Sequence, residues 1–329
     1  MTEQMPVTEF RIDHLPLGSK TRLHLMIDTM PDGSPLMFPT LVVRGSKPGK
    51  TLLATGMVHG DEYEGPIAIQ DVFAELDPQQ MEGTFFAIPV VNGPAMAAGT
   101  REGGWDHLNL ARIFPGSATG SSSQRIADAL TEHIYPQADL YADLHAGGNS
   151  YQIVEFAGYQ LAEGPNGKTQ REAAIAFDLP LVWGTSPLPG RSLSSAREKS
   201  IPAIYVEMTG EGRCRPDVLA RTKQGVNNLL AYLGVVAGTY PTADPQWLIE
   251  DAAESGHLQI QGTSPTSGLF VACVSVWYRV AEGDRLGEVR HPDGRVLAEI
   301  HAPYAGRVLF LRTFPRVFSG DSLCYVLAC

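Results

Sequence analysis

Apolar runs of strand length alternate with helical patterns through the middle of this 329-residue chain. The apolar runs cover residues 51–58, 83–91, 139–144 and 203–208. After the first run, apolar side chains recur with helical spacing from Ile69 to Leu76, and a longer helical pattern runs from Leu219 to Leu233. Strands that alternate with helices predict an α/β sheet with helices on both of its faces.

The regions on either side of this unit have a different pattern. Residues 8–45 are typical of antiparallel strands, with a turn at Pro31-Asp32-Gly33. Residues 237–246, which contain one Gly and two Pro, are typical of a linker, and short strands and turns follow it. A chain of this length is long for a single core. We therefore expect an α/β domain over residues 1–240 and a β-rich domain over residues 247–329.

The β-rich region contains an internal repeat. A Pro-x-x-Gly sequence followed by Val-x-x-Gly-Asp-x-Leu-x-x-Val begins at Pro265 and again at Pro303. Two copies of a short β unit predict a pseudo-twofold β sandwich, and the pattern resembles the biotinyl/lipoyl barrel-sandwich fold. Such carrier domains attach their cofactor to a Lys between the two copies. Residues 289–303 contain no Lys, so the resemblance implies the fold and not the carrier role.

Charge and composition exclude several classes of partner. The net charge is -11 and no Lys/Arg cluster occurs, which argues against a nucleic-acid surface. No apolar run of about 18 residues occurs, so we expect no membrane span. The four cysteines form no Cys-x-x-Cys pair, which argues against a Cys-bound zinc or a disulfide scaffold and favours the cytoplasm. Exposed strand edges in the β-rich region would favour a homo-oligomer.

A Gly-flanked turn directly after the first apolar run contains His59 and Glu62. An imidazole and a carboxylate on one tight turn can both reach a single divalent cation. Zinc accepts such nitrogen and oxygen ligands and keeps an open position when it is catalytic. The alternative is a polar surface turn, because a His and a Glu three residues apart are common in proteins.

His145 is the candidate for a third ligand, because it ends another apolar run and precedes two glycines. Open α/β sheets carry their site residues at the carboxyl ends of strands. Asp143, two residues earlier, lies on the same strand face and can orient the His145 ring. The alternatives are a hydrogen-bonded structural histidine and a solvated or helix-capping carboxylate.

Glu207 follows four apolar residues at the end of the run that starts at residue 203. Burying a carboxylate there costs free energy unless the group has a partner or a task. We interpret Glu207 as a general base that takes a proton from a zinc-bound water and returns it to the leaving nitrogen. A salt-bridged glutamate at a strand end is the alternative.

Residues 92–123 form a long Gly-rich stretch without a clear period, and loops of this length inside a domain are usually functional or disordered. Arg101, Asn109 and Arg112 lie in it. Arginine makes bidentate contacts with carboxylates, so two arginines in one site would suit a substrate with an acidic group. The alternative for each is a solvated loop cation.

These residues resemble those of the succinylglutamate desuccinylase/aspartoacylase family, which is related to the zinc carboxypeptidases. The resemblance spans most of residues 58–212. It is carried, in chain order, by His59-Gly60-Asp61-Glu62, Asn92-Gly93-Pro94-Ala95, Arg101, Asp106, Asn109-Leu110-Ala111-Arg112, Phe114-Pro115-Gly116, Asp143-Leu144-His145-Ala146-Gly147-Gly148 and Glu207. The region after Trp247 also looks like the C-terminal domain of that family.

The resemblance implies a zinc-carboxypeptidase-like α/β/α sandwich with a mixed sheet. It implies one Zn²⁺ per chain, with Glu207 as the base, and it assigns the ligands as His59, Glu62 and His145. Arg112 would hold a substrate carboxylate and Arg101 would polarise the scissile carbonyl. Arg197 stands ten residues before Glu207, where aspartoacylases have another substrate-binding arginine.

One position departs from the family pattern. The family usually has Asn before the carboxylate-binding Arg, and this chain has Ala111. That Asn helps to hold the carboxylate, so its absence puts the identity of the substrate in doubt. Asn109 is the candidate to replace it. Within the family, the chain length and the sequence His-Gly-Asp-Glu-Tyr-Glu-Gly-Pro look most like the deacetylases that act on N-acetyl-diaminobutyrate.

The sequence therefore predicts a zinc amidohydrolase that removes an acetyl-like or succinyl-like group from a small N-acyl amino acid. Two other functions are considered. One is a carboxypeptidase-like metallopeptidase, which a comparison of N-acyl amino acids with peptides would distinguish. The other is a non-catalytic zinc- or ligand-binding module, for which Ala111 is the one favourable feature.

Overall fold

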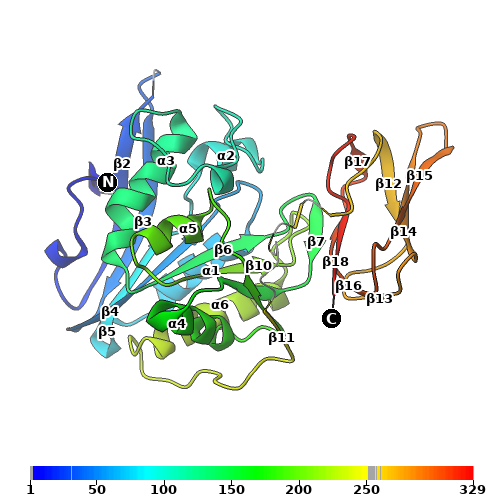
Figure 1. Cartoon of the computed structure of the whole chain (residues 1–329). Coiled ribbons are helices and arrows are strands. Elements are labelled where there is room, and N and C mark those ends of the chain that lie inside the picture. The colour runs from blue at the N-terminus through cyan, green and yellow to red at the C-terminus, as the bar shows by residue number, and fades with distance from the viewer. Residues whose placement is uncertain (1–2, 31, 251–255, 257, 260, 329) are drawn as a thin grey trace.

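A ten-stranded mixed sheet forms the centre of the protein (Figure 1). The structure is a computed structural model that describes residues 3–30, 32–250, 256, 258, 259 and 261–328. The strands of this sheet are β1 (Glu3–Pro6), β2 (Ser19–Thr29), β3 (Pro35–Arg44), β5 (Glu82–Ile88), β4 (Lys47–Gly56), β6 (Leu140–Ala146), β10 (Ala203–Met208), β8 (Phe156–Gln160), β9 (Leu181–Thr185) and β11 (Trp247–Glu250), in spatial order. The three strands at its centre, β4, β6 and β10, run parallel.

Helices cover both faces of this sheet. The α-helices are α1 (Glu64–Glu75), α2 (Gly93–Ala98), α3 (Ser122–Ala129), α4 (Gly164–Ala176), α5 (Ser192–Glu198) and α6 (Pro216–Tyr232). Shorter helical turns span Ile12–His14, Pro78–Gln80, Leu110–Arg112, Leu130–Ile134 and Tyr135–Gln137. Helices α1, α4 and α6 contribute to one buried apolar cluster, and α3 and α5 contribute to a second. The predicted α/β/α arrangement is confirmed.

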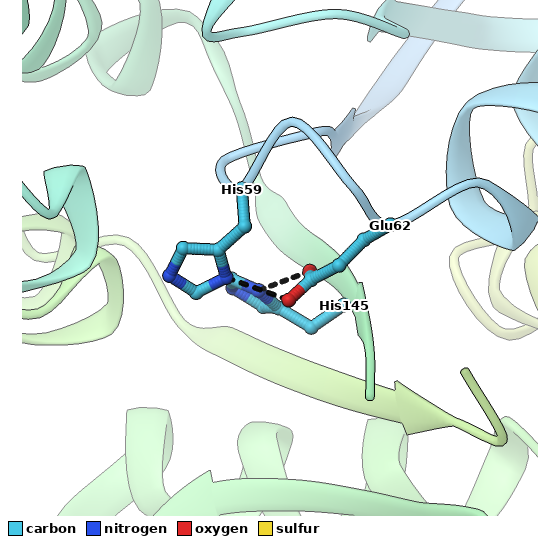
Figure 2. Close-up of side chains that lie close together, drawn as sticks. All are labelled: His59, Glu62 and His145. Carbon is cyan, nitrogen blue, oxygen red and sulfur yellow. Dashed lines mark hydrogen bonds and ion pairs between the residues drawn. The ribbon is translucent and has the colours of Figure 1, made fainter. Parts of the chain in front are cut away.

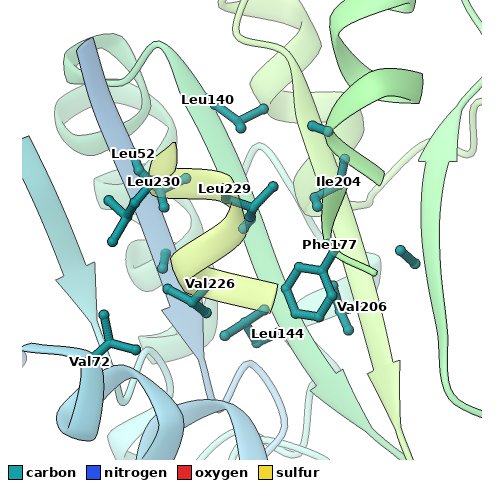
Figure 3. Packing of buried hydrophobic residues seen from close by; sticks show 14 of the residues in the cluster. Leu52, Val72, Leu140, Leu144, Phe177, Ile204, Val206, Val226, Leu229 and Leu230 are labelled. Atoms are coloured by element: carbon teal, nitrogen blue, oxygen red, sulfur yellow. The ribbon is translucent and has the colours of Figure 1, made fainter. Parts of the chain in front are cut away.

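Successive side chains of a strand point to opposite faces, which explains why a buried apolar cluster lies on each face of the sheet. In β4, Leu52 belongs to the first cluster and Leu53 to the second, because successive side chains of a strand point to opposite faces. Figure 3 shows α6 residues such as Val226 and Leu229 packed over the first face. Complete burial of one such Leu contributes about 1.5–3 kcal/mol.

Several elements follow the sequence expectations, and others differ. Strands β2 and β3 pair in antiparallel register, as predicted for residues 8–45; Pro31 of the expected turn lies outside the described residues. A feature that the sequence pattern does not show is the division of the chain near residues 153–156 into β7 (Tyr151–Ile153) and β8. Strand β7 pairs with a C-terminal strand, and β8 enters the large sheet.

The C-terminal region consists of short β-strands that reproduce the repeat. Its strands are β12 (Gly268–Ala272), β13 (Arg279–Val280), β14 (Arg285–Arg290), β15 (Val296–His301), β16 (Gly306–Arg312), β17 (Arg316–Val317) and β18 (Cys324–Leu327). Strand β12 pairs with β14 and β17, and the corresponding strand of the second copy, β16, pairs with β18 and β13. The two copies therefore exchange their short strands, as a pseudo-twofold sandwich requires.

The two predicted domains share strands in this arrangement. Strand β11 joins the large sheet beside β9, and β7 pairs with β16, so the C-terminal strands lie against one end of the large sheet (Figure 1). The division into residues 1–240 and 247–329 stays a prediction. In the described part of the chain, no helix is long and apolar enough to cross a membrane.

Candidate active site

The turn after β4 holds His59 and Glu62 against the end of the sheet. The strand ends at Gly56, and Met57 adopts a left-handed conformation with φ 53° that turns the chain. A Cβ on Gly60 would lie 2.0 Å from a backbone carbon of Ala95 in α2, so only glycine allows this close packing. His59 and Glu62 are buried as a result, with exposed fractions of 3% and 2%.

His145, near the end of β6, lies beside this turn. Figure 2 shows both rings directed at the carboxylate of Glu62. The Nδ1 atom of His59 is 2.7 Å from Glu62 Oε1, and the Nδ1 atom of His145 is 2.9 Å from Glu62 Oε2. One potential ligand atom from each of the three residues lies within 4.8 Å of the other two. The structure thus brings together the three residues that were predicted from the sequence as metal ligands.

Groups outside this triad hold the two rings in place. Asp143 Oδ2 lies 3.0 Å from His145 Nε2, and Asp143 also accepts hydrogen bonds from Thr55 and Ser192. Asn109 Oδ1 lies 3.1 Å from His59 Nε2. In each ring the second nitrogen is thus engaged by an oxygen, which leaves Nδ1 as the atom for a metal. Histidine ligands of metals are typically oriented in this way.

Electrostatics within the cluster favour ionised carboxylates. Burial alone would raise the pKa of Glu62, but His59 and His145 outweigh it and lower that pKa below its ordinary value. Burial alone would lower the pKa of His145, but Asp143 and Glu62 raise it well above its ordinary value. Burial lowers the pKa of His59 to about 4, and Arg101 acts in the same direction. Zinc binds a neutral imidazole, so a metal ion at this site would compete with a proton for His145.

The donor set fits zinc. Two imidazoles and one carboxylate are a ligand combination of catalytic zinc sites, which keep a further position open. The three donors come from one tight turn and one strand end, and all three side chains are buried. Asp61, between the two ligands of the turn, accepts a hydrogen bond from the backbone N–H of Asn149.

Glu207 lies on β10, directly across from His145 in the register of the parallel pair β6–β10. Its Oε2 atom is buried and has no hydrogen-bond partner among the described residues. Burial raises the pKa of Glu207 to about 8. A buried carboxyl oxygen without a hydrogen-bond partner costs free energy, so its place beside the candidate metal ligands is a sign of function rather than of stability.

A cavity with about 650 Å³ of empty space, partly open to solvent, connects these residues. Its lining includes His59, His145, Glu207, Arg101, Arg112 and Arg191. Arg112 donates to Gln259 Oε1 at 2.7 Å, so a C-terminal segment takes part in one wall. Ala111 is also in the lining, and its carbonyl accepts hydrogen bonds from both Arg112 and Arg191.

The sequence interpretation missed Arg191. It precedes α5, lines the cavity and is half-buried, and burial lowers its pKa to about 10. Arg197, the residue chosen from the sequence, is exposed on α5 and is not part of the cavity lining. The available signal was the Pro- and Gly-rich stretch 186–190 that follows β9, because such loops at strand ends position site residues.

Asp106 fixes the long loop that carries Arg101, Asn109 and Arg112. Its carboxylate accepts hydrogen bonds from the side chains of Ser121, Ser122 and Ser123 and from the backbone N–H groups of Leu108 and Ser123. Burial alone would raise the pKa of Asp106, but these hydrogen bonds lower it to about 2. One carboxylate thereby ties the loop to the first turn of α3.

Comparison with known proteins shows which family the chain belongs to. The model of the succinylglutamate desuccinylase/aspartoacylase catalytic domain matches residues 48–233. An N-alpha-acetyl-L-2,4-diaminobutyric acid deacetylase from Halomonas elongata is 33% identical over 298 residues, which cover 88% of this chain and 85% of that protein.

Solved structures extend the similarity to nearly the whole chain. A succinylglutamate desuccinylase from Silicibacter sp. TM1040 is 28% identical with a TM-score of 0.84, covering 95% of this chain and 96% of the other. The product-bound ectoine utilization protein EutE (DoeB) from Ruegeria pomeroyi is also 28% identical with a TM-score of 0.84, covering 96% and 97%. The chain belongs to the succinylglutamate desuccinylase/aspartoacylase family.

Proposed function

We propose that this protein is a zinc-dependent amidohydrolase that removes an acyl group from a small N-acyl amino acid. The observation that carries the proposal is the position of Glu207, whose buried Oε2 atom has no hydrogen-bond partner among the described residues, across from His145 in a cavity that His59 also lines. The names of the relatives, a diaminobutyric acid deacetylase and a succinylglutamate desuccinylase, support the same reaction class.

In this proposal His59, Glu62 and His145 hold the zinc ion. A zinc ion bound there would lower the pKa of a water molecule and polarise the amide carbonyl. Glu207 is the proton acceptor and then delivers the proton to the leaving nitrogen. Its raised pKa suits both directions of transfer, because an efficient acid–base group has a pKa near the working pH.

The cavity arginines bind and stabilise negative charge. Arg101 Nη1 lies 3.5 Å from Glu62 Oε1 and 3.3 Å from His59 Nδ1, so it can stabilise the oxyanion that forms on the scissile carbonyl. Arg112 and Arg191 both donate to the carbonyl of Ala111 and together hold the substrate carboxylate. We transfer to Arg191 the role that the sequence gave to Arg197, because Arg191 lines the cavity.

The sequence suggested that Asn109 replaces the family Asn in holding the substrate carboxylate. The roles that we assign to Asn109 and Ala111 differ from this expectation. The Asn109 side chain contacts His59 and accepts a hydrogen bond from the backbone N–H of Ala111. We therefore assign it the orientation of the His59 ring rather than contact with substrate. Ala111 leaves room in the cavity wall where the family places a larger polar side chain.

A substrate panel tests this function. Purified zinc-loaded protein should hydrolyse at least one N-acyl amino acid and no C-terminally varied peptide, and chelation should abolish the activity. Glu207→Gln should be folded and inactive. Hydrolysis of the peptides alone would indicate a carboxypeptidase-like enzyme, and zinc binding without any hydrolysis would indicate a non-catalytic module.

A further inference from the structure

The cavity extends along one face of the sheet from the candidate metal ligands to the end of β8. Glu207 on β10 pairs with Phe156 at the start of β8, and Tyr205 pairs with Gly158. Gln160 is the next β8 residue on the same face, and it pairs with Thr185 of β9. Four residues of strand separate Gln160 from the level of Glu207, which corresponds to about 13 Å along β8.

Gln160 has a buried acceptor without a partner. The side chain lines the cavity, the residue is 3% exposed, and no donor among the described residues reaches its Oε1 atom. Its Nε2 atom donates to Ser194 Oγ at 2.7 Å. Leaving a buried amide oxygen without a hydrogen bond costs about 1–3 kcal/mol, so this atom calls for an explanation.

The surrounding hydrogen bonds fix the orientation of this amide. The Ser194 hydroxyl donates its one hydrogen to the carbonyl of Leu188, so its oxygen can only accept from Gln160. The NH₂ group of Gln160 must therefore face Ser194, and Oε1 cannot exchange places with it. The backbone carbonyl of Gln160 accepts a hydrogen bond from the Gln170 side chain, which holds the end of β8.

Tyr205 forms the floor between the two ends of the cavity. A Cβ on Gly158 would lie 2.2 Å from two ring carbons of Tyr205, so glycine at this position lets the ring lie across β8. The Tyr205 hydroxyl and the Thr185 side chain share a hydrogen bond. Tyr205 and Thr185 both line the cavity that contains Glu207 and Gln160.

Gln160 is held by α5, the same helix that Arg191 precedes. Ser194, which holds Gln160, lies three residues after Arg191 at the start of α5. A substrate group that reaches Gln160 would therefore lie on the same side of the scissile amide as a carboxylate held by Arg191. Gln160 and Arg191 both line the cavity, which contains Glu207 as its one carboxylate within the described part of the chain.

We propose that Gln160 Oε1 is a specificity determinant that accepts a hydrogen bond from an N–H group on the side chain of the substrate amino acid. A side-chain carboxylate offers no donor and would place its own oxygens against this oxygen. The inference rests on the proposed deacylase function and adds the substrate class: N-acyl amino acids with an amide or ammonium side chain, not with an acidic one.

Substrate pairs of equal shape test this inference. The first pair is N-acetylasparagine and N-acetylaspartate, and the second is N-acetyl-2,4-diaminobutyrate and N-acetylnorvaline. In at least one pair the donor-bearing substrate should have a kcat/KM about tenfold or more above its partner, and Gln160→Leu should reduce that ratio by a similar factor. The pair with the larger Gln160-dependent ratio identifies the donor as amide or ammonium.

The ratio is measured on one preparation, so a partly unfolded variant does not change it. Gln160→Glu should raise the kcat/KM for N-acetyl-2,4-diaminobutyrate relative to N-acetylnorvaline, because it supplies a carboxylate for the ammonium. Gln80→Leu is the matched control, since Gln80 is exposed and its side chain bonds Asp77; it should leave every ratio unchanged.

Preference for N-acetylaspartate by the wild-type protein, or ratios that Gln160→Leu leaves unchanged, would overturn the subsite. Absence of hydrolysis for all four substrates, and for a wider N-acyl panel, would instead overturn the proposed deacylase function on which the subsite depends.

Discussion

The two histidines of the candidate metal centre are held in different ways. His145 lies near the end of a central strand, and its partner Asp143 is fully buried with hydrogen bonds from Thr55 and Ser192. His59 lies on a turn, and the oxygen at its second nitrogen comes from Asn109 in a long loop. One half of the site is built into the sheet and the other half depends on loops, so damage to each half should have different consequences.

The largest effect is expected from His145→Ala. The change removes a zinc ligand and also leaves the buried Asp143 and Glu62 carboxylates without the imidazole that lies between them. Breaking a buried ion pair on one side costs about 3–5 kcal/mol. We expect loss of zinc, loss of activity and a clear fall in Tm. His59→Ala should remove zinc and activity with a smaller fall in Tm, and an equal fall for both variants would contradict the distinction.

Asp143→Asn is a milder change in the half of the metal site that lies on the strands. The amide keeps the shape of the side chain but weakens its interaction with the His145 ring, and loss of such a partner typically lowers metal affinity by about 10- to 100-fold. Competition with a chelator of known affinity measures this change. Asp61→Asn, on the turn between the ligands, should alter zinc affinity less, because Asp61 contacts the backbone of Asn149 and neither histidine.

Asp106→Ala tests the loop-borne half. It removes the hydrogen bonds that tie the long loop to α3, which should lower the free energy of unfolding by about 1–2 kcal/mol and reduce kcat/KM while zinc stays bound. The pKa of Asp106 in the folded protein is lowered to about 2 from an ordinary value of 3.8. Its contribution is therefore complete above about pH 4 and is lost as the pH falls toward 2.

Urea unfolding of the wild type and of Asp106→Ala across this pH range tests whether the stabilising contribution of Asp106 is lost in acid. The difference between the two proteins should shrink as the pH is lowered. A difference that grows in acid would show that the carboxylate is not stabilised by its serine partners.

The smallest effect is expected from Gln259→Leu. This change removes the hydrogen bond between the C-terminal segment and Arg112. We expect KM to rise by a few-fold with kcat nearly unchanged, because the contact steadies a binding residue and not the reacting atoms. Kinetics against the preferred N-acyl amino acid measure it; a fall in kcat with constant KM would place Gln259 closer to the chemistry than the structure does.

The same difference between strands and loops decides what the sequence predicts. His145 and Glu207 stand at the ends of apolar runs, and neighbouring parallel strands bring such ends to one edge of a sheet. Their meeting therefore follows from pattern alone. The alternation of apolar runs and helices likewise predicts the α/β core, and the Pro-x-x-Gly repeat predicts a pseudo-twofold sandwich, in which the structure then shows β13 and β17 exchanged between the copies.

Other parts of the site depend on contacts that no local pattern encodes. Arg191 enters the cavity because the loop before α5 folds back onto Ala111, whereas Arg197 one turn into α5 faces solvent. Gln160 matters because β8 pairs antiparallel to β10 and brings its end along the cavity. The break between β7 and β8 depends on pairing with β16, more than 150 residues later in the chain. The sequence shows these residues but not the partners that give them a role.

The central claim is that two glutamates of the site, the buried Glu62 and the half-buried Glu207, have different tasks, one as metal ligand and one as base. Zinc content per chain, measured for the matched variants Glu62→Gln and Glu207→Gln together with deacylation, tests it most directly. The account predicts one zinc per chain and no turnover for Glu207→Gln, and loss of both zinc and turnover for Glu62→Gln. Full zinc in Glu62→Gln, or loss of zinc from Glu207→Gln, would contradict it.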